Sequence, residues 1–150
     1  MGDKTKNIFI TIAYFIFAIA FLSSLGIWLP MAIDNYNLDG ISDETFKTLP
    51  SNLLTYSLGI FLIATIDRVL FLFFRTGEYS NNILEFFAIL FLICGTGFLV
   101  FVSLKSIKNS SIDEALKYAK YITVIAWAAW FYVKLQASKS NNFSPIGGIL

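Results

Sequence analysis

Mostly hydrophobic residues gather in four long runs along the chain, and short polar segments separate these runs. The runs cover residues 8–28, 53–74, 84–104 and 118–135. At a rise of about 1.5 Å per residue, about 20 residues cross the ~30 Å hydrocarbon core of a bilayer. The shortest run has Lys120 and Lys134 near its ends, where long side chains extend to the lipid headgroups. The pattern therefore predicts four transmembrane helices.

The continuity of these runs also decides the fold class. Transmembrane β-strands alternate apolar and polar residues over about ten positions, whereas these runs are continuous. Hydrophobic residues make up 57% of the chain and charged residues 14%, and the mean hydropathy is +0.70, which is far from the composition of a soluble domain. We predict an all-α integral membrane four-helix bundle with short loops, a single domain over residues 1–150 whose last part, 136–150, is a short tail.

The first run has an alternative interpretation as a cleaved signal peptide. Lys4 and Lys6 precede it, and the segment Ala18-Ile19-Ala20 is typical of a cleavage site. However, the apolar region of a signal peptide has about 7 to 15 residues, and this run continues to Trp28. We therefore favour a retained span; cleavage would leave three spans.

Two local signals predict details of the helices. Ser111 followed by Glu114 forms a capping box, which places the start of the fourth helix just before its apolar run. Small residues allow membrane helices to approach closely, so they predict contact positions. The candidate pairs are Ala20 with Ser24, Gly95 with Gly97, and Ala115 with Ala119.

The orientation follows from the first helix, because Lys and Arg residues near all the span ends nearly balance. Lys4 and Lys6 precede the first run, and the loop after it carries Lys47 among several carboxylates. Basic residues favour the cytoplasmic side, and the first helix usually dominates. We expect a multi-pass protein with both termini in the cytoplasm.

The adjacent charges Asp67 and Arg68 lie inside the second run, roughly 10 Å below the headgroups. A charge at a helix centre costs about 2.5–3.5 kcal/mol, so such residues face a bundle interior, a watery cavity or each other. Neighbouring residues point about 100° apart on a helix, so each charge needs a partner on another helix or subunit. Polar residues available in the spans are Thr11, Ser23, Ser24, Thr96 and Thr123. Alternatively, the bilayer boundary lies near Ile66 and both charges are interfacial.

The residue types argue against catalysis. The chain has no His, and its one Cys, Cys94, lies inside an apolar run, where a thiol usually serves as a small hydrophobe. Glu85 stands at the mouth of the third run, so within the membrane Asp67 has no second carboxylate for acid–base work. Glycine-rich phosphate loops and basic nucleic-acid patches are absent from the sequence. We predict a protein that is not an enzyme, has no cofactor or metal, and makes no direct contact with nucleic acid.

Two segments outside the spans are candidate partner surfaces. The acidic segment 34–50 is a candidate for external recognition through Asp39, Asp43 and Glu44. In the tail, a polar linker leads to apolar residues able to dock on a soluble protein or back on the bundle. These residues are Phe143, Ile146, Ile149 and Leu150. The alternative for the tail is a frayed terminus.

Four short-looped spans, an acidic first loop, the Asp67-Arg68 pair and a small tail together resemble the membrane subunit of the bacterial Kiwa anti-phage defence system. The resemblance is one of architecture and covers the whole chain in outline. It implies a tetrameric sensor in the bacterial inner membrane, which recruits and controls a cytoplasmic DNA-binding effector that blocks phage replication and transcription.

Two other function classes fit the same pattern. A toxin-immunity or superinfection-exclusion protein would bind an incoming protein through the acidic segment. A small oligomeric ion channel or transporter would use Asp67 or Arg68 along a pore, because rings of charge set ion selectivity.

Overall fold

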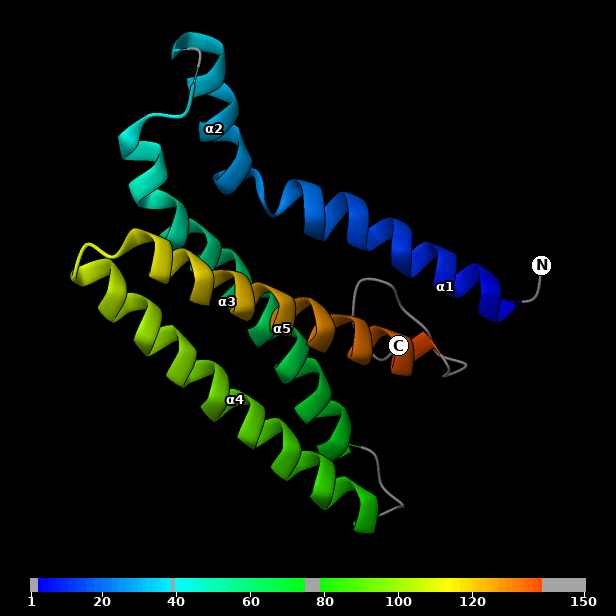
Figure 1. Ribbon diagram of the computed structural model, residues 1–150. Helices are drawn as coiled ribbons and strands as arrows, with labels where there is room; N and C mark the ends of the chain where they lie inside the picture. The colour runs from blue at the N-terminus through cyan, green and yellow to red at the C-terminus, as the bar shows by residue number, and fades with distance from the viewer. Residues whose placement is uncertain (1–2, 39, 75–78, 139–150) are drawn as a thin grey trace.

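The computed structural model describes residues 3–38, 40–74 and 79–138, which are helical apart from short connections (Figure 1). The elements are α1 (Asp3–Tyr14), the π-helix η1 (Phe15–Leu22), α2 (Leu25–Leu38), α3 (Asp43–Phe74), α4 (Tyr79–Lys108) and α5 (Ile112–Ser138). Over these ranges there is no β-strand, so the all-α prediction is confirmed.

Two helices are by themselves long and apolar enough to cross a membrane. They are α3 over Asp43–Leu70 and α4 over Ile83–Lys108. A third span exists if α1, η1 and α2 are taken together as one bent unit. Helix α5 covers the predicted span 118–135 but is not in this group, since its lysines and its Tyr and Trp side chains lower its hydropathy. The membrane prediction thus holds for two to three helices.

The first predicted span is broken, whereas the sequence suggested one continuous helix over 8–28. The π-helix ends at Leu22, and α2 continues after Ser23 and Ser24 at an angle of 54°. The Ser23 hydroxyl donates to the Ala18 carbonyl at 2.7 Å, and the Ser24 hydroxyl donates to the Ala20 carbonyl. Serine hydroxyls bonded back to the preceding turn bend helices, which explains the break.

Side chains donate hydrogen bonds to four carbonyl groups next to the break. The carbonyls of Ala18, Ile19, Ala20 and Phe21 accept hydrogen bonds from the side chains of Ser23, Tyr56, Ser24 and Trp28, respectively. Further along, Pro30 has no N–H for the Gly26 carbonyl, and Asn52 of α3 donates to it at 3.1 Å. These hydrogen bonds lower the cost of placing irregular backbone in an apolar environment.

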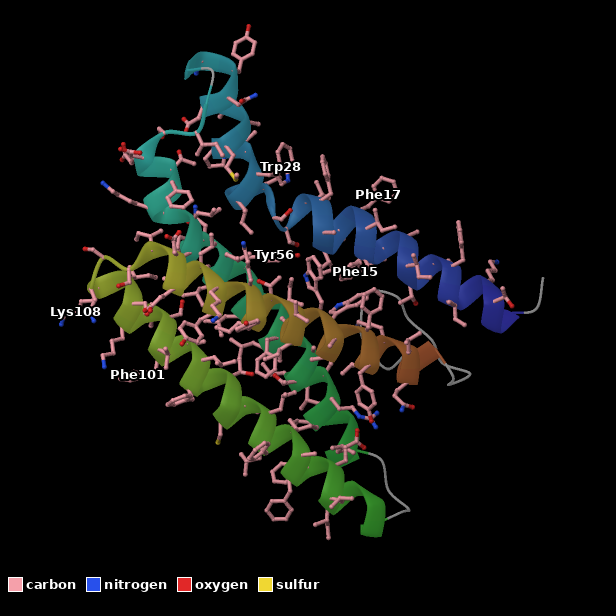
Figure 2. All side chains as sticks on the ribbon, viewed as in Figure 1. Phe15, Phe17, Trp28, Tyr56, Phe101 and Lys108 are labelled. Atoms are coloured by element: carbon pink, nitrogen blue, oxygen red, sulfur yellow. The ribbon has the colours of Figure 1, made fainter. Side chains whose placement is uncertain are left out.

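The core lies between α3 and α5. Its larger cluster comprises Ile60, Phe61, Ala64, Ala126 and Trp130, and a smaller one comprises Leu54, Ala119 and Ile122. The hydroxyls of Ser57 and Thr123 join the two helices by a buried hydrogen bond of 2.6 Å. Phe15 points from η1 toward α5, where it contacts Trp127, Trp130 and Phe131, while Phe17 and Phe101 point outward (Figure 2).

The predicted small-residue contacts differ in outcome. Ala115 and Ala119 are fully buried against the neighbouring helices, as predicted. At Gly95 and Gly97 an added Cβ would meet no atom within 4 Å, so these two positions make no helix contact in the described chain. The Ala20 and Ser24 pair is joined by a bond within its own chain segment, not across helices.

A tight turn joins α4 to α5. Ser110 adopts a left-handed conformation with φ 61°. Its N–H donates to the Ile107 carbonyl, and the Ser111 N–H donates to the Ser106 carbonyl. Together these two bonds form one Schellman motif. Helix α5 then begins at Ile112, so the start predicted from the capping box is confirmed.

Candidate functional site

Four charged residues and one tyrosine from three helices meet at one end of the bundle. Asp67 and Arg68 lie on α3, Glu85 lies on α4, and Tyr132 and Lys134 lie on α5. We call these five residues the charge cluster. Because Asp67 and Arg68 are adjacent on one helix, their side chains diverge and each one pairs with a different helix.

Arg68 and Glu85 form a two-pronged ion pair between α3 and α4. The Nε atom of Arg68 donates to Oε1 of Glu85 at 2.6 Å, and its Nη2 atom donates to Oε2 at 2.8 Å. The Tyr132 hydroxyl donates to the same Oε1 atom at 3.1 Å, and the guanidinium lies 5.7 Å from the centre of the Tyr132 ring. Planar bidentate ion pairs combine strength with a defined geometry. Together with the contacts of Tyr132, this pair fixes the register of α3, α4 and α5.

Asp67 and Lys134 form the second ion pair, between α3 and α5, at 3.2 Å. The Lys134 side chain is 7% exposed and the Asp67 side chain 34%. We expected Lys134 to extend to the headgroups, and this was wrong because a carboxylate lies within its reach inside the bundle. The lysine is therefore held by its ion pair, with only the carboxylate partly open to the exterior.

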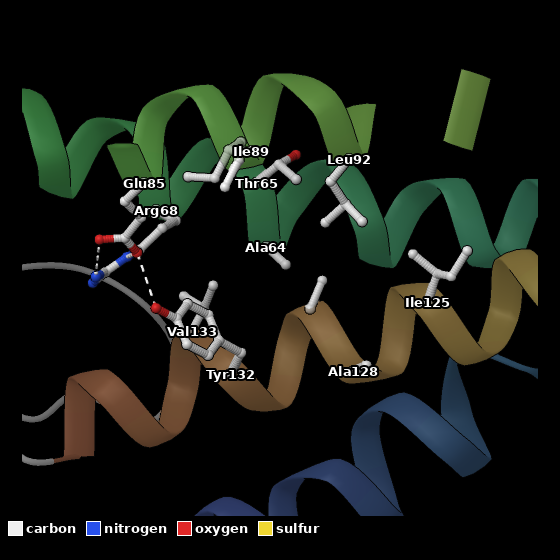
Figure 3. Close-up of a pocket in the computed structure, with 12 residues that line it drawn as sticks. Ala64, Thr65, Arg68, Glu85, Ile89, Leu92, Ile125, Ala128, Tyr132 and Val133 are labelled. Atoms are coloured by element: carbon white, nitrogen blue, oxygen red, sulfur yellow. Dashed lines mark hydrogen bonds and ion pairs between the residues drawn. The ribbon is translucent and has the colours of Figure 1, made fainter. Parts of the chain in front are cut away.

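A cleft of about 470 Å³ lies beside the charge cluster (Figure 3). Ala64 and Thr65 of α3 form its floor, and α4 and α5 form its walls. Its surface is almost entirely apolar except where Arg68, Glu85 and Tyr132 close one end. The cleft follows from the divergence of α4 and α5, which start side by side at their tight turn and then separate (Figure 1).

The other predicted site residues are not part of this cluster. Asp43 and Glu44 lie exposed in the first turn of α3. Nearby, Asp34 accepts hydrogen bonds from the Ser42 N–H and hydroxyl at 3.0 and 2.7 Å, which ties α2 to the start of α3. Outside the described residues are Asp39 and the tail residues Phe143, Ile146, Ile149 and Leu150.

Comparison with known proteins adds no assignment. No family model, curated protein or solved structure matches the chain. The resemblance to the Kiwa membrane subunit consequently remains a proposal. Among the residues whose positions are described, no group of three or more His, Cys, Asp or Glu side chains is placed to hold a metal ion.

Sequence reasoning located two members of the charge cluster and missed their partners. It placed Glu85 at the mouth of a span and Lys134 at the end of another, and it sought partners among hydroxyl groups instead. The missed signal is the distance of each charged residue from the end of its helix. Glu85 follows the start of α4, and Asp67 and Arg68 precede the end of α3, by about the same number of residues. Charges at matching depths on helices joined by a short turn are natural neighbours.

Proposed function

We propose that this chain is a non-enzymatic membrane subunit, a sensor or scaffold that recruits and controls a cytoplasmic effector, as the resemblance to Kiwa implies. The observation that carries the proposal is the charge cluster, which joins α3, α4 and α5 at one end of the bundle. At that same end α5 leads into the tail and α3 leads into the connection to α4. A change in helix packing there would move the segments that a partner contacts.

The proposed location is the bacterial inner membrane, with four spans and both termini cytoplasmic. Helix α1 starts and α5 ends at the same end of the molecule, which supports placing both termini on one side (Figure 1). Helix α5 would count as the fourth span because its buried Lys134 is neutralised by Asp67, and pairing lowers the cost of a charge in lipid.

Self-association is part of the proposal, and the resemblance suggests a tetramer. Helix α4 supports it, because only 11% of its most apolar window is buried, against 33% for α3. Its exposed side chains include Phe91, Phe98 and Phe101. Neighbouring copies and lipid would share this surface.

Protection against phage tests the sensor role directly. The double variant Arg68→Met, Glu85→Leu removes one ion pair without changing net charge, and it should abolish protection measured as plating efficiency, in a host that carries the effector. A double variant of exposed residues on α1 and η1, Phe9→Leu with Phe17→Leu, serves as the control and should protect normally. Unchanged protection by the charge-free variant, at equal protein level, would refute a role for the cluster in sensing.

A channel is the second candidate function, and the break at Ser23 and Ser24 is the observation that favours it. Transporters commonly use broken helices near their binding sites. Against this, the carbonyls at the break and the charges of the cluster have partners within the chain. Ion flux into liposomes that Asp67→Asn abolishes would support conduction over the sensor role.

An immunity or exclusion protein is the third candidate, and exposed Asp43 and Glu44 favour it. Neutralising Asp39, Asp43 and Glu44 together should then remove activity while leaving assembly intact. On the sensor proposal with a cytoplasmic partner, the same triple variant still recovers that partner.

A further inference from the structure

The cleft beside the charge cluster opens to the side of the bundle and not to its end. Ala88 and Leu92 of α4 line it, and so do Ala128 and Tyr132 of α5, and all four are exposed. Ala64 and Thr65 at its floor are buried. In a bundle that spans a bilayer, an opening between two helices faces the lipid.

The interior of the cleft matches a hydrocarbon chain. Its volume of about 470 Å³ lies within the usual range of ligand pockets. Alanines provide much of its lining, and the one hydroxyl on its floor, that of Thr65, already donates to the Phe61 carbonyl at 2.8 Å. Water would find no partners along such a wall, whereas apolar groups fill it at no cost in hydrogen bonds.

The closed end of the cleft offers one positive and one negative group, Arg68 and Glu85, that neutralise each other. Pockets for anionic lipids instead carry clusters of basic residues. A lipid with a negative phosphate and a positive amine presents both signs in one headgroup. Its charges complement the pair, whereas an anionic headgroup would also meet the carboxylate of Glu85.

We propose that this cleft binds one zwitterionic phospholipid, with an acyl chain between α4 and α5 and the headgroup against Arg68, Glu85 and Tyr132. The site goes beyond the proposed function and does not require a protein partner. A lipid seated there fills the space between the diverging helices and supports their spacing.

Native mass spectrometry of the full-length chain in mild detergent tests this proposal. Phosphatidylethanolamine and phosphatidylglycerol with identical acyl chains are added in equal amounts. We expect the zwitterionic lipid to be retained roughly fivefold over the anionic one, the ratio given by one charge contact. Equal retention of both lipids, or preference for the anionic one, would overturn the assignment of the headgroup.

Filling the cleft provides the second arm of the test. Ala88→Leu and, on the opposite wall, Ala128→Leu should each lower retention of phosphatidylethanolamine about tenfold, since excluding two methylene groups corresponds to that change. Ala32→Leu is the matched control, because Ala32 is exposed on α2 and does not line the cleft. If both cleft variants fold normally and retain lipid as well as the control does, the site is refuted.

Glu85→Gln supplies a third arm, because it removes one negative charge and makes the closed end of the cleft more positive. The preference should then reverse, with phosphatidylglycerol retained roughly fivefold over phosphatidylethanolamine. An unchanged preference in this variant would contradict recognition of the headgroup by the ion pair.

Discussion

The residues of the charge cluster contribute unequally to the stability of the fold, because their side chains differ in exposure. Lys134 is nearly buried while the Asp67 side chain is one-third exposed. Removing the carboxylate leaves a buried ammonium without a partner, whereas removing the ammonium leaves a carboxylate that still reaches the exterior.

We therefore expect Asp67→Asn to lower the free energy of unfolding by about 1–3 kcal/mol, and Lys134→Met by less. The double variant should be no less stable than Asp67→Asn alone, since replacing both charges removes the unpaired ion. Thermal unfolding in detergent measures all four forms. Additive losses would show that the two residues do not interact.

Tyr56 joins three parts of the chain through one hydroxyl. It accepts a hydrogen bond from the Trp127 Nε1 group at 3.0 Å and donates one to the Ile19 carbonyl at 3.1 Å. Tyr56→Phe should lower the free energy of unfolding by about 1–3 kcal/mol, since the Trp127 Nε1 group and the Ile19 carbonyl both lose this hydrogen-bond partner.

Tyr121→Phe is the matched control for this effect, because Tyr121 is half exposed on the surface of α5. It should change stability by less than about 0.5 kcal/mol. Proteolysis near the break in the first span should also become faster in Tyr56→Phe alone. Equal stability of the two variants would contradict the role of Tyr56 in holding η1 on the bundle.

At the scale of elements, the turn between α4 and α5 contains a residue in an unfavourable conformation. A left-handed conformation costs most L-residues about 1 kcal/mol, and glycine avoids that cost. Ser110→Gly should therefore raise the melting temperature, and Ser110→Val should lower it. If glycine lowers the melting temperature, the turn does not have this geometry in the folded protein.

The apolar runs located α3, α4 and α5, but the sequence did not predict α2, which continues to Leu38 where a loop was expected. It also did not predict where the helices are interrupted or which helices are neighbours. Long apolar runs predict α3 and α4 because a bilayer requires that length. The Ile19 carbonyl near the break is paired by the hydroxyl of Tyr56, which lies more than 30 residues away in the sequence, so this contact could not be read from the local pattern. Likewise, hydropathy places Glu85 and Lys134 near span ends but does not show which helices pack together.

At the scale of the whole molecule, the orientation of the chain in the membrane decides which segments face a cytoplasmic partner. In a Cys94→Ser background, Glu44→Cys should react with a membrane-impermeant maleimide in intact cells, whereas Lys6→Cys should react only after the cells are opened. This result would place the acidic segment outside and the N-terminus in the cytoplasm. The reverse labelling would contradict the orientation and, with it, the cytoplasmic partner.

The tail should carry the contact with that partner. A chain truncated after Ser138 keeps α5 intact and should lose the partner on affinity purification. Replacing the four apolar tail residues by serine should do the same, while Ser140→Ala with Asn141→Ala and Asn142→Ala should have no effect. Recovery of the same cytoplasmic protein by the truncated chain would disprove docking through the tail.

The most direct test of the central claim is purification of the tagged chain from its native host in mild detergent, followed by native mass measurement of the complex. We predict a homo-oligomer that carries one cytoplasmic protein in a fixed ratio. A homo-oligomer with no other protein bound would contradict the sensor and scaffold role and would favour a channel or an exclusion protein.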